Sequence, residues 1–387
     1  MPRRRRLFHP LWLLVSLPLY MGWRLIPPLM LGPLGSLGAA ALLAGISILV
    51  PISVRRSDRL AWAGLTGLGF LSTLLVMTVL RDLLLGLAAP FLDPAPLATL
   101  IQASARCALA LAALITIVGL LIARRPRLVE VDVPIPDLPE PLWGFSIAQI
   151  TDVHIGSTIR RGFVERLVSR VNDLEADLIA VTGDLVDGSV QHLSEHAAPL
   201  AKLNARHGCY FVTGNHEYYS GEPAWTLEIQ RLGMTVLKNR HVVLHHDGAL
   251  LVVAGVDDPG APRFHPEQRS DPAGALHGAP AGAGARILLA HQPSSAAAAA
   301  RAGFDLQISG HTHGGQFWPW NHFVRFFQPF TAGLHRLKDL WVYVSRGTGY
   351  WGPPNRFGVP SEITRIRLVH AAAGTAGAPP LDRSPRQ

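Results

Sequence analysis

Cysteine is scarce in this chain: only Cys107 and Cys209 among 387 residues carry a thiol. Two cysteines cannot build a disulfide framework or a four-cysteine zinc knot, so sulfur says nothing about the cellular compartment. Charged residues are also few, at 16%, and the basic ones outnumber the acidic ones, giving a net charge of +8. The arginines fall at the borders of apolar runs and form no patch interleaved with aromatic residues, which argues against a nucleic-acid partner.

Apolar residues are concentrated before Arg124. Four stretches there approach the ~20 residues that a helix needs to cross a bilayer: residues 7–23, 34–54, 60–80 and 100–123. A cleavable signal peptide is the alternative for the first stretch, which follows four arginines and contains Pro18. We favour an uncleaved helix, because three further spans follow and no small-x-small cleavage site stands out. Buried core helices are the alternative for the other three, and their length and lack of charge argue against it.

Arginine clusters predict the orientation of these spans. The clusters lie before the first span, between the second and third, and after the fourth: Arg3, Arg4, Arg5 and Arg6; Arg55, Arg56 and Arg59; Arg124, Arg125 and Arg127. The opposite loops contain only Arg24 and Arg81, the latter next to Asp82. The positive-inside rule therefore predicts an integral protein of the cell (inner) membrane whose amino terminus and soluble domain are cytoplasmic. The lipid bilayer is its expected partner, with arginines against anionic headgroups.

The sequence divides into four predicted parts. They are a membrane region of about four helices, residues 1–125; a linker, 126–142; a soluble domain, 143–370; and a disordered tail, 371–387. Prolines from Pro134 to Pro141 favour an extended connector in the linker. The alternation of Val129, Val131 and Val133 leaves open a first edge strand in the same segment.

Polar clusters follow the apolar runs of the soluble domain. They are Asp152-Val153-His154, Gly183-Asp184-Leu185-Val186-Asp187, Gly214-Asn215-His216-Glu217, His291, and Gly310-His311-Thr312-His313. The preceding runs, such as residues 145–150 and 178–181, are short and rich in β-branched or aromatic residues, so each is predicted to be a buried strand. Segments with helical spacing separate several of them. An α/β fold would bring the clusters together at the carboxyl ends of its strands.

The clusters offer oxygen and imidazole ligands and almost no sulfur, which suits a pair of hard or borderline divalent ions. Any one Gly-Asp or Asn-His pair is more often a turn than a metal site. Five clusters, each at the end of a predicted strand, argue against turns for the whole set. Gly183, Gly214 and Gly310 directly precede predicted ligands, and a residue without Cβ lets the backbone turn sharply and approach an ion closely.

This series resembles the calcineurin-like metallophosphoesterase superfamily, whose blocks are Asp-x-His, Gly-Asp-x-x-Asp, Gly-Asn-His-Asp/Glu, His and Gly-His-x-His. All five blocks are present in order, and the resemblance covers about residues 143–369. The ending from Gly310 to Gln316 and the segments around Arg346 and Arg356 resemble a bacterial, membrane-anchored branch. The resemblance implies a four-layer α/β/β/α sandwich that hydrolyses phosphoric esters, preceded here by a transmembrane helical bundle.

The resemblance also implies a role for each motif residue. Six residues would bind two divalent ions, three residues to each ion. The first ion would have Asp152, His154 and His313, and the second would have Asn215, His291 and His311. Asp184 would bridge the ions, and together they would activate the water that attacks phosphorus. His216 would be the catalytic residue that protonates the leaving oxygen or steadies the transition state. Nitrogen and oxygen ligands admit manganese, iron or zinc.

Two acidic motif residues stay open. Asp187 is better interpreted as orienting a ligand than as a ligand itself. The superfamily allows either acid at the position of Glu217. For both residues, a turn or a solvated charge is about as well supported as a role in the site.

The membrane region suggests a substrate class. Phosphodiester or pyrophosphate bonds in a lipid-linked substrate are favoured, because the anchor confines the site near the bilayer. Aromatic residues crowd between Phe317 and Phe330, and we expect this segment, including Trp318 and Phe323, to form an apolar lip that admits a lipid tail. The alternatives are a general or cyclic-nucleotide phosphodiesterase and a non-catalytic nucleotide-binding signalling protein. The intact ligand set argues against the last, and the sequence does not indicate an oligomeric state.

Overall fold

The computed structural model describes residues 11–53 and 59–371. Its contacts divide the chain into two units. The helical unit comprises the residues up to Leu121 together with Gly352–Phe357, and the sheet unit comprises Ile122–Trp351 and the residues from Gly358 onward. The tail expected to be disordered lies outside the described residues except for Ala371.

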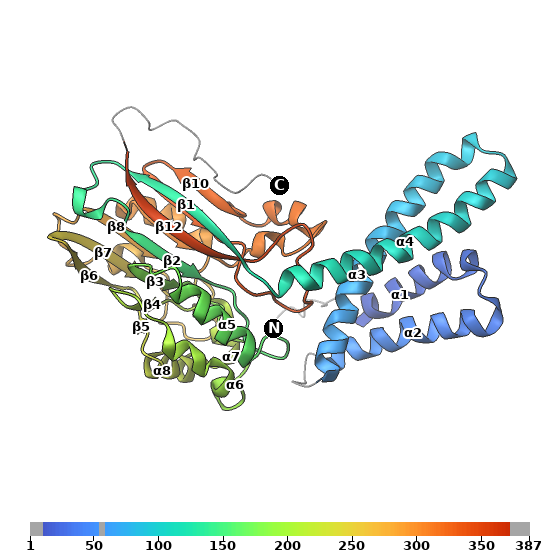
Figure 1. The fold of residues 1–387 in the computed structure, drawn as a ribbon, viewed down its shortest axis with the longest axis horizontal. Coiled ribbons are helices and arrows are strands. Elements are labelled where there is room, and N and C mark those ends of the chain that lie inside the picture. The colour runs from blue at the N-terminus through green and yellow to red at the C-terminus, as the bar shows by residue number, and fades with distance from the viewer. Residues whose placement is uncertain (1–10, 54–58, 372–387) are drawn as a thin grey trace, which may run out of the picture. The chain divides into compact units, whose positions relative to one another are not determined.

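Four helices form the helical unit: α1 Leu11–Leu25, α2 Gly32–Ser53, α3 Arg59–Ala88 and α4 Pro94–Ala123 (Figure 1). By length and composition, α2, α3 and α4 are each able to cross a membrane. α1 has 15 residues; at 1.5 Å per residue it spans about 22 Å, less than the ~30 Å hydrocarbon core. The expected first span, 7–23, begins among residues outside the described part of the chain. A fourth membrane span therefore stays a prediction.

A partly buried ion-pair cluster joins α1, α3 and α4. Asp82 accepts hydrogen bonds from Arg24 Nε at 2.8 Å, from Tyr20 Oη at 2.6 Å and from Arg81 Nη1 at 3.2 Å. Arg81 Nε also donates to Ser104 Oγ at 3.1 Å. Ionised groups among apolar helices are costly unless they are paired. The pairing explains how two arginines are accommodated in this apolar region.

The segment Gly352–Phe357 packs against α4 within the helical unit. The Arg356 amide donates to the Gly119 carbonyl at 3.1 Å. A Cβ built at Gly119 would collide with the Asn355 side chain. Gly119 is therefore a point of close approach, which gives a physical reason for a glycine near the carboxyl end of the apolar helix α4.

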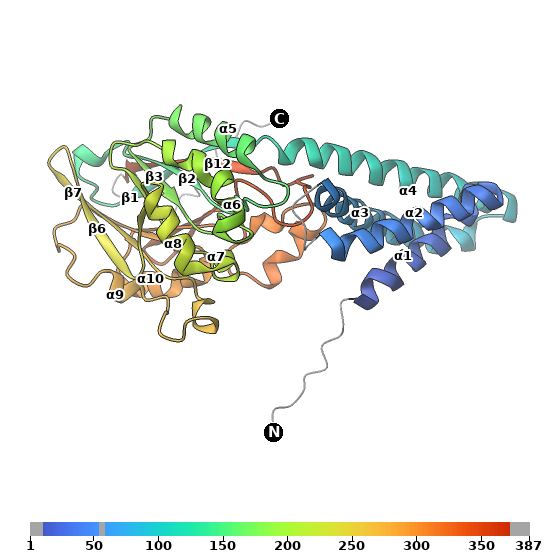
Figure 2. The same cartoon turned by 90° about the horizontal axis from the view of Figure 1, so that it is seen from below.

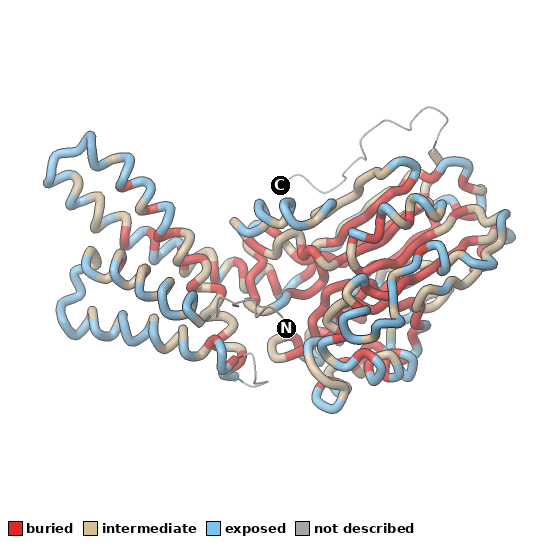
Figure 3. The backbone as a smooth tube through the Cα atoms, turned by 180° about the vertical axis from the view of Figure 1, so that it is seen from behind, coloured by how far each residue is buried: buried red, intermediate tan, exposed pale blue. Residues whose placement is uncertain are grey.

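Two six-stranded sheets form the centre of the sheet unit. The first has, in order, β1 Arg127–Ile135, β12 Glu362–His370, β2 Ser146–Ile150, β3 Leu178–Val181, β4 Cys209–Phe211 and β5 Thr235–Val236. The second has β10 Gly333–Leu337, β11 Leu340–Val344, β9 Leu306–Ser309, β8 Ala285–Leu289, β7 Ala249–Gly255 and β6 Arg240–His246. Buried residues are concentrated in these strands (Figure 3).

Helices cover the outer face of each sheet and complete four layers. Residues of α5 Arg161–Asn172, α6 Val190–Ala197 and α8 Glu222–Arg231 share a core with the first sheet. The short helices α9 Pro272–Ala275 and α10 Ala296–Ala302 share another with the second sheet, on the far side from α5 (Figure 2). A third core lies between the sheets. The predicted α/β/β/α sandwich is confirmed, because every sheet face is apolar and each finds a cover.

The segment 126–142, for which a linker and an edge strand were both open, contains the strand β1. β1 pairs in parallel with β12 from Arg127↔Glu362 to Ile135↔His370. Arg367 Nε donates to Asp132 Oδ1 at 2.8 Å across this pair. The connection between α4 and β1 is therefore only residues 124–126, and the alternating valines, not the prolines, decide the local structure.

Candidate metal centre

Strand ends bring the five sequence clusters together. β2, β3 and β4 run parallel in the first sheet, and β8 and β9 run parallel in the second. The polar residues follow these strands within a few positions, so they converge at one edge of the sandwich. Three groups of His, Asp or Glu residues have ligand atoms within 4.8 Å of one another. Of the seven predicted ligands, all except Asn215 belong to at least one group, and His216 belongs to one as well.

The first group is Asp152, His154 and His313. His313 Nε2 lies 3.3 Å from Asp152 Oδ1 and 3.0 Å from His154 Nε2. Two imidazole nitrogens at this distance present a lone pair to each other unless a proton or a cation lies between them. The group therefore has the donor set and the spacing of a cation site.

The second group is Asp184, His291 and His311. His291 Nε2 lies 3.1 Å from Asp184 Oδ2, and His291 Nδ1 lies 2.8 Å from the Thr182 carbonyl, which fixes the ring. Asn215 lines the same pocket as His311, and its Oδ1 is buried without a hydrogen-bond partner among the described residues. A buried orphan oxygen is costly, and a divalent cation would satisfy it.

Asp184 lies between the two groups. Its Oδ2 is 3.1 Å from His291 Nε2 on one side and 4.0 Å from His154 Nε2 on the other. Its Oδ1 accepts a hydrogen bond from the His216 amide at 2.8 Å. This is the position that a carboxylate shared by two cations requires, since its charge offsets their mutual repulsion.

Asp187 belongs to none of the three groups, but its carboxylate contacts two histidines that do. Its Oδ1 is 3.0 Å from His154 Nδ1 and 2.6 Å from His216 Nδ1. Coulomb attraction and hydrogen bonds from both rings outweigh burial and lower the pKa of the Asp187 carboxyl. The contacts match the interpretation of Asp187 as an orienting residue.

Glu217 is buried and accepts three backbone hydrogen bonds. Its Oε2 accepts from the amides of Asp184 at 3.0 Å and Gly214 at 2.7 Å, and its Oε1 accepts from the Leu185 amide at 2.7 Å. Burial, together with the nearby Asp184 charge, raises the pKa of Glu217 to about 7. The structure thus shows Glu217 joining two ligand-bearing loops, not a solvated charge.

Backbone strain is concentrated at the candidate ligands. Five of them have a positive φ, although none is glycine: Asp152 at 52°, His154 at 55°, Asp184 at 51°, His311 at 72° and His313 at 51°. Such conformations persist only where the surroundings enforce them, and they cluster at functional sites. A Cβ at Gly310 would collide with Asp152, and one at Gly214 would collide with Asp184. Glycine at these two positions lets the loops close around the ligands.

The pKa values of two of the candidate ligand rings shift in opposite directions. Burial, reinforced by the charge of His291, lowers the pKa of His311 to about 4, so this ring is neutral and available as a ligand at neutral pH. Burial opposes the charged form of His154 as well, but Asp187 and two further carboxylates outweigh it and raise its pKa to about 9. The three carboxylates around His154 call for positive charge, which a divalent ion would supply in place of the proton.

Comparisons with known proteins can be set beside this geometry. The family profile described as calcineurin-like phosphoesterase matches residues 145–315. A transmembrane protein with metallophosphoesterase domain from Danio rerio is 38% identical over 273 residues, which are 68% of this chain and 62% of that protein. An uncharacterized metallophosphoesterase from Aquifex aeolicus is 33% identical over 225 residues, which are 57% of this chain and 84% of that protein. This chain belongs to the calcineurin-like metallophosphoesterases.

Membership confirms the superfamily predicted from the five blocks. An uncharacterized metallophosphoesterase from Helicobacter pylori is 36% identical over 63% of this metallophosphoesterase and 64% of its own length. This chain therefore spans less than two thirds of the Danio rerio and Helicobacter pylori relatives. Animal and bacterial proteins both occur among the relatives.

Two aromatic residues of this metallophosphoesterase border the site without having been predicted. The ring of Tyr219 lies 5.2 Å from the His216 ring, and the ring of Trp351 lies 5.8 Å from it. The Trp351 amide donates to Gln316 Oε1 at 2.9 Å, and Gln316 Nε2 donates back to the Trp351 carbonyl at 2.8 Å. Gln316 ends the sequence block that contains His313, but its pairing with Trp351 is visible only in the structure. No pattern in the sequence pointed to Trp351 or to Tyr219.

Proposed function

We propose that this metallophosphoesterase hydrolyses phosphate esters at a centre of two divalent ions, with manganese, iron or zinc as candidates. The ions would be held by Asp152, His154 and His313 on one side and by Asn215, His291 and His311 on the other. The observation that supports this most directly is the place of Asp184 between the two groups. When bound, the ions would draw electrons from the phosphoryl oxygens and lower the pKa of the attacking water.

His216 would supply the proton that the reaction needs. In the hydrolysis, the water oxygen bonds to phosphorus and loses one proton, the bond to the leaving oxygen breaks, and that oxygen takes a proton from His216. His216 Nδ1 is held by Asp187, which leaves Nε2 facing the centre, 4.0 Å from Asp184 Oδ2. We assign Nε2 as the donor and Asp187 as the residue that fixes the ring and its tautomer.

Removing the metal is expected to abolish hydrolysis of bis-p-nitrophenyl phosphate by the full-length chain in detergent, and added manganese should restore it. The reason is that both water activation and charge neutralisation depend on the ions. Release of p-nitrophenolate and metal analysis of the same sample measure this, and turnover of the diester should exceed that of p-nitrophenyl phosphate.

Diester turnover that survives complete metal removal would contradict the proposal. A chain that binds no metal would favour the non-catalytic signalling alternative. Two bound metals without turnover of either ester would indicate a narrow natural substrate.

The sequence and the helices support a cytoplasmic catalytic domain at the cell (inner) membrane. If α3 and α4 both cross, the sheet unit after α4 lies on the same face as the connection before α3, whatever the role of α1. Both of these borders are rich in arginine, at Arg55 and Arg56 and again at Arg124 and Arg125, whereas residues 89–93 between α3 and α4 contain none. The positive-inside rule places the arginine-rich face in the cytoplasm.

Exposed aromatic residues after His313 support a lipid-linked substrate. Phe323, Phe326 and Phe327 are exposed to 51%, 69% and 81%. Trp318, which was expected to share in the lip, is only half-buried, whereas Trp320 is exposed and lies 6.1 Å from Phe323, ring to ring. A group of large exposed aromatic rings is favourable at a membrane interface and unfavourable in water.

Replacing Phe323 and Phe327 by serine should lower kcat/KM about tenfold for a p-nitrophenyl ester of phosphatidic acid in mixed micelles. Losing part of the apolar contact of two phenyl rings costs about 1.4 kcal/mol, which is a factor of ten. Hydrolysis of the soluble bis-p-nitrophenyl phosphate should change less than about twofold. Leu227→Ser on α8, which replaces another exposed apolar side chain, is the matched control and should affect neither substrate. An equal loss on both substrates would exclude the lip.

A further inference from the structure

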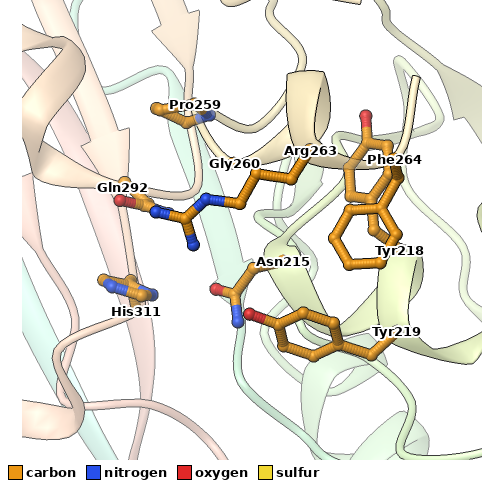
Figure 4. Close-up of a pocket in the computed structure, with 9 residues that line it drawn as sticks. All are labelled: Asn215, Tyr218, Tyr219, Pro259, Gly260, Arg263, Phe264, Gln292 and His311. Carbon is orange, nitrogen blue, oxygen red and sulfur yellow. The ribbon is translucent and has the colours of Figure 1, made fainter. Parts of the chain in front are cut away.

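A pocket of about 310 Å³ adjoins the candidate metal centre. Asn215 and His311, both proposed metal ligands, line one side of it, and Tyr219, Arg263 and Gln292 are among the residues that line the rest. Figure 4 shows the Arg263 guanidinium reaching across the pocket toward Gln292 and His311, while the Tyr219 hydroxyl points toward Asn215. The hydrogen-bond donors of both side chains therefore face the space beside the second metal site.

Arg263 brings a positive charge that no carboxylate balances. Among the described residues, none that lines the pocket is acidic, and no hydrogen bond or ion pair is formed by the Arg263 side chain. The residue is exposed, so its charge is solvated and ready to exchange water for a ligand. A guanidinium has two parallel N–H donors that match the oxygens of a phosphoryl group. The ligand that best complements Arg263 in this pocket is therefore an anion.

The backbone that carries Arg263 is fixed to the metal centre. Asp258 is buried; its Oδ1 accepts from the Gly260 amide at 2.7 Å, and its carbonyl accepts from the Ala261 amide at 2.9 Å. Gln292 Nε2 donates to both carboxylate oxygens of Asp258, at 3.1 and 3.0 Å. Gln292 directly follows the proposed ligand His291, so the loop holds Arg263 in register with the metal site.

We propose that Arg263, assisted by Tyr219, binds a second phosphoryl group next to the one that is hydrolysed, so that the preferred substrates are diphosphate esters. The inference rests on the proposed function and narrows its substrate class. The scissile phosphoryl group would lie at the metal centre, and the pocket beside Asn215 and His311 would receive the neighbouring one. Hydrolysis breaks a P–O bond of the bridge, and the OH of the water bonds to phosphorus. His216 gives a proton to the leaving phosphate, the second hydrogen of the water replaces that proton, and two monoesters result.

A matched pair of substrates tests this with the full-length, manganese-loaded chain: bis-p-nitrophenyl phosphate and P1,P2-bis-p-nitrophenyl diphosphate, which differ by one phosphoryl group. Wild type should prefer the diphosphate. Arg263→Ala should reduce kcat/KM for the diphosphate about tenfold to a hundredfold more than for the monophosphate diester, since a charge-assisted hydrogen bond is lost only there. Arg263→Lys keeps the charge without the bidentate geometry, so its kcat/KM for the diphosphate should lie between those of the wild type and Arg263→Ala. Phosphorus NMR identifies the products.

Binding gives a readout that is independent of turnover. The non-hydrolysable P1,P2-diphenyl methylenediphosphonate should bind Arg263→Ala more weakly than wild type by a similar factor in calorimetry. Arg269→Ala, an exposed arginine outside the pocket lining, is the control and should leave both substrates and the analogue unchanged. Equal losses on both substrates, or unchanged binding of the analogue, would overturn the subsite while leaving the hydrolase intact. No wild-type turnover of either substrate by a chain that has lost its metal would instead overturn the proposed function, and no turnover by a chain with two bound metals would overturn the preference for diphosphate esters.

Discussion

Asp184→Asn should lower kcat/KM for bis-p-nitrophenyl phosphate by about three orders of magnitude, equivalent to about 4 kcal/mol of transition-state stabilisation. Asn retains the shape and can still accept the His216 amide hydrogen bond of 2.8 Å at Oδ1. It removes the negative charge that lies 3.1 Å from His291 Nε2 and faces His154 from the other side. Removing a residue that only hydrogen-bonds to a metal ligand already lowers metal affinity or activity about 10- to 100-fold. Removing the charge of a ligand shared by both ions should therefore lower the activity further.

The measurement compares steady-state hydrolysis and bound metal for the wild type and the variant. Asp173→Asn, an exposed carboxylate beyond the end of α5, is the control and should stay within about twofold of wild type. A variant that has lost most of its metal supports a ligand role for Asp184. Turnover close to wild type with a full metal content would show that Asp184 is not shared between the ions.

Glu217→Ala should lower the free energy of unfolding by at least about 3 kcal/mol, because three buried amides lose their acceptor at once. Those amides belong to Asp184, Leu185 and Gly214, so the substitution also releases the loop that carries Asp184. For a domain of this size the loss corresponds to a fall of about 6 to 12 °C in Tm. Thermal unfolding in detergent, followed by near-ultraviolet circular dichroism, measures it.

Glu217→Gln separates charge from hydrogen bonding. The glutamine oxygen can still accept, but its amide nitrogen would face backbone N–H groups, so we expect an intermediate Tm. Glu195→Ala on the exposed side of α6 should change stability by less than about 0.5 kcal/mol. If Glu217→Ala unfolds at the wild-type temperature, the three hydrogen bonds do not hold these loops together.

The sequence was sufficient for the features that local chemistry determines. Buried strands are short apolar runs, and the carboxyl ends of the parallel strands β2 and β3 place Asp152 and Asp184 together. His291 follows β8 of the second sheet and reaches them only because the two sheets pack face to face. The small residues Gly214 and Gly310 marked the close approaches that the structure contains. These features are local, or they follow from the geometry of parallel strands, so they can be predicted from the amino-acid sequence alone.

Features that depend on long-range packing could not be predicted in this way. The role of Glu217 stayed open, because its three partners are backbone amides, which leave no trace in the sequence. Arg263 belongs to a segment rich in Pro, Gly and Ala, and only the pocket beside Asn215 gives it significance. The prolines after Pro134 suggested a connector, whereas pairing with a strand 235 residues away decides the fold of β1.

That pairing has a consequence for how the protein is made. β12 lies between β1 and β2, so the first strand to follow α4 in the chain has no partner until the last described strand has left the ribosome. Until then β1 and one edge of β2 are unpaired, and exposed edges of this kind invite association with other chains. Contacts this distant in sequence also form slowly. Insertion of α2, α3 and α4 into the membrane during synthesis would keep the unpaired strand β1 close to the bilayer and away from other nascent chains.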